Sequence, residues 1–181
     1  MSETKNSEKN GIDKVFIIAE AGVNHNGQLD HAIEMIRVAK NSGADAVKFQ
    51  TGIPEEFISR DAKKADYQKE STSSTQSQLD MIKDIFLPLR DFKILKDECD
   101  SFDIEFLSSP FDIKSIDFLL ELGVKRLKIP SGEITNYPYL KHIGNKKIPL
   151  ILSTGMSSLF EIKEALKIIT ESGLERGDIT V

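Results

Sequence analysis

The stretch VFIIAEAGVNHNG, residues 15–27, contains the pattern that decides the fold. Its first seven residues form an apolar run that only Glu20 interrupts, and a polar segment with two glycines follows. A continuous run of this length is typical of a strand in a parallel sheet, which is buried on both faces. Apolar residues at helical spacing then occupy residues 29–39, and Gly43 supplies a stop signal. The stretch therefore predicts one strand followed by one helix.

The same unit recurs along the chain. Further apolar runs lie at residues 44–50 (ADAVKFQ), 104–109 (IEFLSS), 126–131 (RLKIPS) and 149–154 (PLILST), and residues 179–181 begin a sixth. Helical patterns separate the runs, and one of them opens with the capping-box spacing of Ser158 and Glu161. Strands that alternate with helices predict an α/β fold with a parallel sheet. Most strand spacings are about 22 to 30 residues, close to the roughly 30 residues per unit of a TIM barrel.

A complete TIM barrel has eight strands, whereas this sequence has five and the start of a sixth. We therefore expect a (β/α)8 TIM-barrel-type domain, truncated to about its first five to six units, over residues 14–181. Residues 1–13 are polar and predict a flexible tail, and the polar segment 51–77 predicts a long functional loop. A doubly wound sheet stays open on pattern alone, although residues 21–27 lack a dinucleotide-binding glycine fingerprint.

Composition narrows the class of protein. The formal net charge of -5 argues against a nucleic-acid or membrane-surface partner but not against a small phosphorylated anion. No apolar run is long enough for a membrane span, and the first residues do not resemble a signal peptide. A single cysteine, Cys99, excludes an internal disulfide and fits a cytoplasmic location. We expect Cys99 to be a small half-buried packing residue, not a nucleophile.

Polar side chains gather where the predicted strands end, and in a parallel barrel those ends meet at one rim. They are Glu20, Asn24, His25, Lys48, Gln50, Ser109, Lys128, Ser131, Glu133 and Ser153. Two lysines and several hydroxyls predict an anion site, and Glu20 or Glu133 could serve as base or metal ligand. Taken singly, each has a plainer interpretation as a solvated strand end, helix cap or loop anchor. We expect Met156, after the fifth strand, to serve packing only.

Five ordered motifs carry a family resemblance. They are IAEAGVNHNG (18–27), VKFQT (47–51), FLSSPFD (106–112), KIPSGEITNYPYL (128–140) and ILSTGM (151–156), and KKADYQ (63–68) adds to them. Together they resemble the sialic acid synthase family, which includes N-acetylneuraminate, legionaminate and pseudaminate synthases. The resemblance implies that phosphoenolpyruvate condenses with an N-acylated 2-amino sugar, N-acetylmannosamine or a diacetamido-trideoxy hexose, to give a nonulosonate and phosphate.

The resemblance also implies roles for single residues. Glu20 and Glu133 are then catalytic, and Glu133 also approaches a divalent metal, manganese or magnesium. The residues implied to bind phosphoenolpyruvate are Lys48, Ser109, Lys128, Ser131 and Ser153, and those implied to bind the sugar are Gln50, Asn24 and Tyr67. Family members often have Thr where this chain has Ser109, and the hydroxyl is retained. Two metal-binding histidines and an antifreeze-like domain that swaps in a homodimer would lie beyond Val181. We therefore expect the 181-residue chain to be inefficient in catalysis alone.

Three other functions stay open at this point. Lys48 or Lys128 could form a Schiff base, as in an aldolase of the same fold. A truncated fragment could bind phosphate or sugar without turnover. A related synthase could use a phosphorylated aldose in place of the amino sugar.

Overall fold

The structure is a computed structural model that describes residues 15–62, 64 and 76–181. The predicted tail of residues 1–13 lies outside the described residues. In these residues, six strands follow one another with helices between them: β1 (Ile18–Gly22), β2 (Ala46–Thr51), β3 (Glu105–Pro110), β4 (Leu127–Ile129), β5 (Leu150–Leu152) and β6 (Ile179–Thr180). The helices of the same part of the chain are α1 (Leu29–Asn41), α2 (Pro54–Phe57), α4 (Gln78–Ile85), α5 (Leu89–Ser101), α6 (Ile113–Glu121), α7 (Tyr137–Gly144) and α8 (Leu159–Glu171). The α/β alternation predicted from the apolar runs is confirmed.

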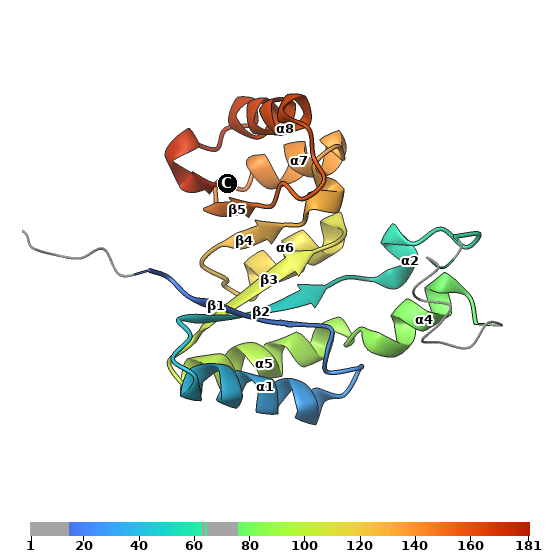
Figure 1. The fold of residues 1–181 in the computed structure, drawn as a ribbon, viewed down its shortest axis with the longest axis vertical. Coiled ribbons are helices and arrows are strands. Elements are labelled where there is room, and N and C mark those ends of the chain that lie inside the picture. The colour runs from blue at the N-terminus through green and yellow to red at the C-terminus, as the bar shows by residue number, and fades with distance from the viewer. Residues whose placement is uncertain (1–14, 63, 65–75) are drawn as a thin grey trace, which may run out of the picture.

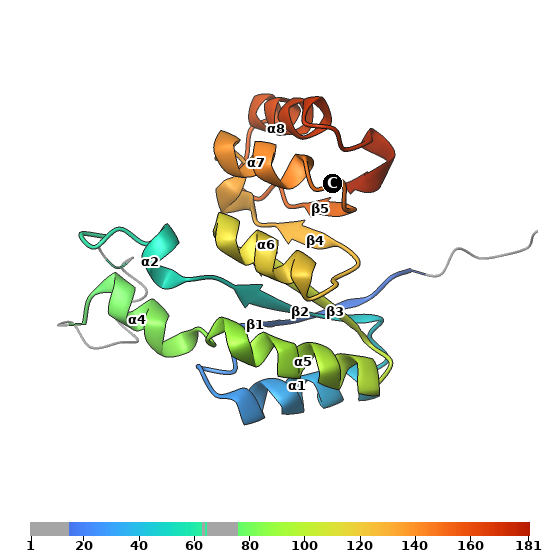
Figure 2. The same cartoon turned by 180° about the vertical axis from the view of Figure 1, so that it is seen from behind.

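The strands run parallel in sequence order. They form two three-stranded sheets, β1-β2-β3 and β4-β5-β6, which adjoin where β3 lies beside β4. Figures 1 and 2 show α1 and α5 against β1–β3, and α7 and α8 beyond β4 and β5. Parallel neighbours in chain order, each joined by a helical crossover, are the arrangement of a (β/α) barrel. The described residues thus form a partial TIM barrel.

Strands β2, β4 and β5 each bury one face against the helices. In β2, Val47 and Phe49 are buried whereas Lys48 and Gln50 are only half-buried. β4 and β5 alternate in the same way, with half-buried Lys128 in the middle of β4. Successive strand residues point to opposite faces, so the half-buried residues share the inner face of the partial barrel. The sequence predicted burial on both faces, and β3 is buried on both, with Leu107 and Ser108 fully buried. In β2, β4 and β5 only the helix-facing side is fully buried.

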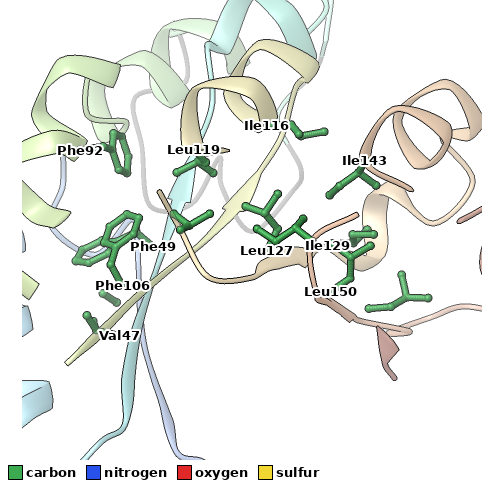
Figure 3. Close-up of a cluster of buried hydrophobic side chains, with 14 of the residues drawn as sticks. Val47, Phe49, Phe92, Phe106, Ile116, Leu119, Leu127, Ile129, Ile143 and Leu150 are labelled. Atoms are coloured by element: carbon green, nitrogen blue, oxygen red, sulfur yellow. The ribbon is translucent and has the colours of Figure 1, made fainter. Parts of the chain in front are cut away.

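The core lies between the strands and their helices. Phe49 stacks on Phe106 with ring centroids 5.9 Å apart, and Phe92 of α5 meets Phe106 edge-on at 6.5 Å. Figure 3 shows this aromatic group beside the aliphatic cluster that includes Leu127, Ile129 and Ile143. Burying a side chain of this size stabilises a fold by about 1.5–3 kcal/mol. The core therefore fixes which face of each strand turns inward.

Local signals explain where the helices begin. Ser158 accepts the backbone N–H of Glu161, and the Glu161 carboxylate accepts the N–H of Ser158, so the predicted capping box is present. The Asp112 carboxylate caps α6 through the N–H of Ser115 at 2.8 Å. Pro88 separates α4 from α5, because proline cannot donate the hydrogen bond that a continuous helix would need. The segment predicted as one long loop contains the short helix α2, so that prediction was wrong for residues 54–57.

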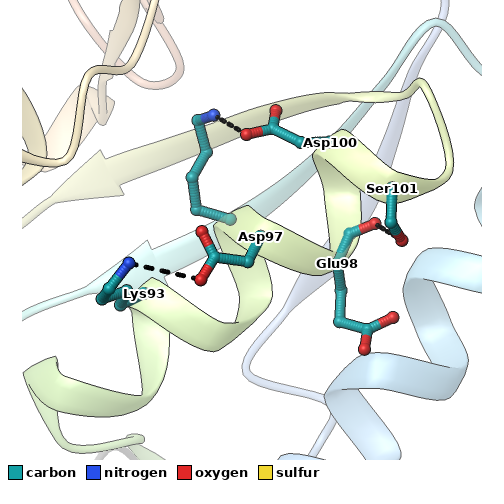
Figure 4. A network of polar contacts seen from close by, with 6 residues as sticks. Lys93, Asp97, Glu98, Asp100 and Ser101 are labelled. Atoms are coloured by element: carbon teal, nitrogen blue, oxygen red, sulfur yellow. Dashed lines mark hydrogen bonds and ion pairs between the residues drawn. The ribbon is translucent and has the colours of Figure 1, made fainter.

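The exposed face of α5 carries ion pairs at helical spacing. Lys93 pairs with Asp97 at 3.3 Å and Lys96 with Asp100 at 2.5 Å, as Figure 4 shows for this helix. Ser101 donates its hydroxyl to the carbonyl of Glu98 at 2.8 Å in the last turn. Exposed pairs of this kind contribute only about 0.3–0.5 kcal/mol each. They solubilise the helix surface and do not position the site.

Among the described residues, no helix has the length and apolar character that a membrane crossing requires.

A substitution at Gly144, the last residue of α7, tests how closely α7 packs on α8. A Cβ atom there would lie 2.7 Å from the carbonyl oxygen of Ile169 and 2.8 Å from the Cβ of Ser172. Alanine is the better helix former by about 1 kcal/mol, but overpacking costs about 1–3 kcal/mol. We expect Gly144→Ala to lower the free energy of unfolding by about 1–2 kcal/mol in urea titrations. Gly177→Ala, which meets open space, is the control and should change it by less than about 0.5 kcal/mol. Equal values for the two variants would contradict this packing.

Candidate active site

The strand registers bring the predicted polar residues to one face. Glu20 of β1 is opposite Lys48 of β2, and Gln50 of β2 is opposite Ser109 of β3. In β4, Lys128 is opposite Ile151 of β5. Because these residues alternate with the buried core positions, they lie on the inner face of the partial barrel. The predicted convergence of strand-end side chains is therefore present for these residues.

Glu20 and Lys48 form an ion pair. The Lys48 ammonium contacts the Oε2 atom of Glu20, with 12% of the Lys48 side chain exposed and 52% of the Glu20 side chain exposed. The carboxylate in an otherwise apolar strand is thus partnered, which removes most of the cost of placing it there. Because its outer side is exposed, Glu20 can still meet a second group.

Lys128 belongs to the same electrostatic neighbourhood. Burial lowers the pKa of Lys128 most, the positive charge of Lys48 lowers it further, and the negative charge of Glu20 opposes both. Three charged groups from β1, β2 and β4 therefore interact on one face, with two positive charges and one negative. A bound anion would stabilise the charged form of both lysines.

Ser109 adds an unused hydrogen-bonding group. Its side chain is 2% exposed, and its Oγ atom has no hydrogen-bond partner among the described residues. An unsatisfied buried hydroxyl costs about 1–3 kcal/mol, so it marks a place where a ligand or water would be bound. It lies across from Gln50, whose side chain is half-buried on the same face.

Glycines leave room around these side chains. A Cβ at Gly22 would lie 3.2 Å from Oε1 of Glu20 and 3.7 Å from Nε2 of Gln50. Gly22 has φ +58°, a conformation that other residues rarely adopt. On the far side, a Cβ at Gly155 would lie 3.3 Å from the hydroxyl of Ser131, so the ends of β4 and β5 also meet closely. Ser153 is half-buried beside them, and its N–H donates to the carbonyl of Ile129 at 3.1 Å.

Glu133 lies in a different neighbourhood. It ends the short helix η1 (Ser131–Glu133), and its Oε2 atom accepts the side-chain amide of Asn136 at 2.7 Å. It lines a cavity of about 340 Å³ together with Phe57, Phe111, Asp112 and Tyr139, among others. Burial raises the pKa of Tyr139 well above its usual value, and the negative charges of Glu133 and Asp112 raise it further. The charge of Glu133 thus affects the pKa of Tyr139, whereas the charge of Glu20 affects the pKa of Lys128.

The other predicted residues are placed as follows. Asn24 is exposed in the turn after β1, where its N–H donates to the carbonyl of Ala21. Tyr67 lies outside the described residues. Cys99 is fully buried, and burial raises the pKa of its thiol to about 12, as expected for a packing residue. Met156 is fully exposed with φ +59°, so the expected packing role was wrong; the loop carries its side chain away from the core.

His25 anchors the loop that follows β1. The side chain is fully buried near the ring of Phe49, and Nδ1 accepts the N–H of Gly27 at 3.2 Å. In the neutral ring Nε2 then carries the proton, and this buried atom has no partner among the described residues. Burial lowers the pKa of His25. The loop-anchor interpretation is the one that these contacts support.

Local sequence patterns marked Thr51 and Ser108 only as polar strand ends and indicated no role for them or for Asp112. All three are buried polar residues at the ends of β2 and β3, and all make hydrogen bonds between the two strand ends. One sequence signal could have pointed to these residues: their hydroxyl and carboxyl groups stand at positions that strand alternation assigns to the buried face. That signal is weak, because a strand-end Thr or Asp also suits a turn or helix cap.

Comparison with known proteins fits this geometry. Residues 35–180 match the profile of the NeuB family. The chain belongs to the NeuB family. N,N'-diacetyllegionaminic acid synthase of Legionella pneumophila is 53% identical over 154 residues, which cover 85% of this chain and 43% of that protein. The synthase of the same name from Campylobacter jejuni is 51% identical over 170 residues, which cover 94% of this chain and 51% of that protein. The family resemblance stated from the motifs is confirmed.

A solved NeuB-type structure has the same arrangement of strands. N-acetylneuraminic acid synthetase of Leptospira borgpetersenii, in complex with citrate, superposes with a TM-score of 0.74 at 32% identity. The alignment covers 88% of this chain and 51% of that one. This NeuB-family chain therefore spans about half the length of the relatives it matches.

The described residues do not by themselves supply a complete metal site. Residues 15–62, 64 and 76–181 contain no group of three His, Cys, Asp or Glu side chains placed to hold an ion. Glu133 offers one carboxylate, and one of its oxygens is hydrogen-bonded to Asn136. A bound manganese or magnesium would thus need ligands in addition to Glu133.

His25 makes the stability of this NeuB-family chain depend on pH. Its folded pKa lies below the unfolded value of about 6.5, so its contribution is full above that pH and is lost as pH falls through the folded pKa. His25→Asn keeps an acceptor near the Nδ1 position but cannot take up this proton. Between about pH 7 and pH 5, wild type should therefore lose more free energy of unfolding than the variant. Urea titrations across this range test it, and parallel pH profiles would contradict it.

Proposed function

We propose that this chain carries the enolpyruvate-phosphate half of a nonulosonate synthase site. The observation that carries the proposal is the joint placement of Lys48 and Lys128 on one inner face, balanced only partly by Glu20. Phosphoenolpyruvate presents a phosphate and a carboxylate, so its charge complements two ammonium groups. The unpaired hydroxyl of Ser109 and the hydroxyls of Ser131 and Ser153 supply directed donors on the same rim.

The reaction fits these residues without a side-chain nucleophile. The C3 carbon of phosphoenolpyruvate attacks the aldehyde carbon of the sugar and forms the new C–C bond, and the electron pair of the aldehyde C=O bond moves to its oxygen. Water adds at C2, and the proton that it loses ends on the former aldehyde oxygen. The C2–O bond to phosphate then breaks, and the remaining C2 hydroxyl proton leaves with inorganic phosphate to give the 2-keto acid. The lysines are proposed to hold the anion throughout, and Glu20, half exposed beside Lys48, is proposed to take a proton from the water.

The second substrate is proposed to be an N-acylated 2-amino sugar. Two relatives above 50% identity are N,N'-diacetyllegionaminic acid synthases, whereas the human N-acetylneuraminate-9-phosphate synthase is 36% identical. This difference favours a diacetamido-trideoxy hexose over N-acetylmannosamine. Gln50 and Asn24 are proposed to face the sugar, and Tyr67 keeps that role as a proposal.

Other parts of the family pattern stay proposals for the same protein. Glu133 is proposed to act on the sugar side and, with ligands outside the described residues, to help hold manganese or magnesium. The full-length form is proposed to be a domain-swapped homodimer in the cytoplasm. In this chain, residues 14–181 are proposed to form the amino-terminal part of the TIM-barrel synthase domain.

A Schiff-base aldolase is the second candidate, because the lowered pKa of Lys128 favours the free amine that such chemistry needs. Borohydride reduction in the presence of pyruvate separates the two functions. The synthase predicts no covalent adduct by mass spectrometry. A stable mass increase on Lys128 would support the aldolase instead.

Phosphoenolpyruvate binding tests the proposed site. We expect calorimetry to show binding to the 181-residue chain, and Lys128→Met to weaken it by at least about tenfold. This is the loss that follows when a hydrogen bond to a charged group, worth about 1.5–3 kcal/mol, is removed. Lys125→Met, an exposed lysine just before the same strand, should leave the affinity within about twofold. Absence of binding by wild type, or equal losses in both variants, would contradict the proposal.

A further inference from the structure

Two hydroxyls meet on the buried side of β2 and β3. The Oγ1 atom of Thr51 lies 2.7 Å from the Oγ atom of Ser108, and both side chains are fully buried. The Ser108 hydroxyl also donates to the carbonyl of Phe49 at 3.2 Å. This group lies on the helix-facing side, opposite the face that carries the lysines.

The hydrogen-bond directions follow from the number of protons. Ser108 has one hydroxyl proton, and it goes to the carbonyl of Phe49. The Thr51 hydroxyl must therefore donate to Ser108. The result is a directed chain from Thr51 through Ser108 to the backbone of β2. It orients the last residue of β2 against β3 more narrowly than apolar packing would.

Two backbone contacts extend this connection beyond the sheet. The N–H of Phe111 donates to the carbonyl of Thr51 at 2.9 Å, and the N–H of Ile53 donates to the Asp112 carboxylate at 2.8 Å. Asp112 also accepts the N–H and the hydroxyl of Ser115, at 2.8 Å and 2.7 Å. The ends of both strands are thus fixed to each other and to the start of α6.

The hydrogen bonds of Thr51, Ser108 and Asp112 form a clasp between the ends of β2 and β3. The residues proposed to face the ligand alternate with Thr51 and Ser108 along the two strands. Gln50 immediately precedes Thr51, and Ser109 immediately follows Ser108. Since neighbouring strand residues point to opposite faces, a rotation of either strand end moves the clasp and the ligand-facing side chain together. Among the described residues, the side chain of Ser109 has no hydrogen bond that would orient it. Its direction toward a ligand therefore depends on the backbone that the clasp fixes.

We propose that Thr51 and Ser108 are positioning residues for the anion site and hold Gln50 and Ser109 in the orientation that binds phosphoenolpyruvate. The inference rests on the proposed function and adds to it two residues that do not touch the ligand. A preorganised site binds more tightly because less ordering remains to be done on binding.

Calorimetry with phosphoenolpyruvate tests the role in the 181-residue chain. Thr51→Val keeps the shape and removes the donor, and we expect the affinity to fall by about threefold to thirtyfold. Thr51→Ser keeps the hydroxyl and should restore the affinity to within about twofold of wild type. Ser108→Ala should weaken binding to the same extent as Thr51→Val. The double variant should lose little more than either single one, because one chain of bonds is broken in each case.

A control of similar stability separates positioning from general loosening. Ile116→Val removes one methyl group from the fully buried core of α6 and leaves the clasp intact. Urea midpoints identify which variants are equally destabilised. Weaker binding by Thr51→Val than by Ile116→Val, with recovery in Thr51→Ser, supports the proposal.

Three results would overturn it. If wild type and Thr51→Val bind phosphoenolpyruvate equally, or if Ile116→Val loses as much affinity, the positioning role fails while the proposed function stands. If wild type itself does not bind, the proposed function fails and the positioning role fails with it.

Discussion

The alternation of side chains along parallel strands is the constraint on which the site depends. In β2, Val47 and Phe49 are buried against the helices. Lys48 lies between them and Gln50 follows Phe49, so both side chains must point to the inner face. The same rule places Lys128 between Leu127 and Ile129. A shift of one residue in β2 or β4 would bury a lysine and expose core residues, which makes the register of these strands energetically well defined. Packing of the apolar residues thus determines where the charges lie.

The charges in turn explain why the inner face suits an anion. Lys48 and Lys128 repel each other, burial disfavours the charged form of Lys128, and Glu20 offsets only part of this cost. Ser109 adds a buried hydroxyl that no described group satisfies. These features cost stability in the free protein, and a phosphate or carboxylate bound there would offset them together. Such unsatisfied groups are expected at a binding site more than in a structural core.

Much of the fold could be predicted from local signals. The six apolar runs became strands within a few residues of their expected limits, and the Ser158–Glu161 capping box begins α8. The placement of Lys48, Lys128, Glu20, Gln50 and Ser109 followed from the rule that barrel strands end at one rim. The position of Glu133 did not follow, because η1 directs it toward Asn136 and the cavity beside Phe111. The exposure of Met156 and the Thr51–Ser108 clasp depend on tertiary contacts that no local pattern encodes.

The central claim is that amines from β2 and β4 of this NeuB-family chain hold one enol phosphate. A crystal structure of the chain grown with phosphoenolpyruvate tests it most directly. The account predicts a single bound molecule whose anionic oxygens lie within hydrogen-bond distance of Nζ of both Lys48 and Lys128, with one oxygen near Oγ of Ser109. A ligand bound elsewhere, or one that contacts only one of the two lysines while the other faces solvent, would contradict it.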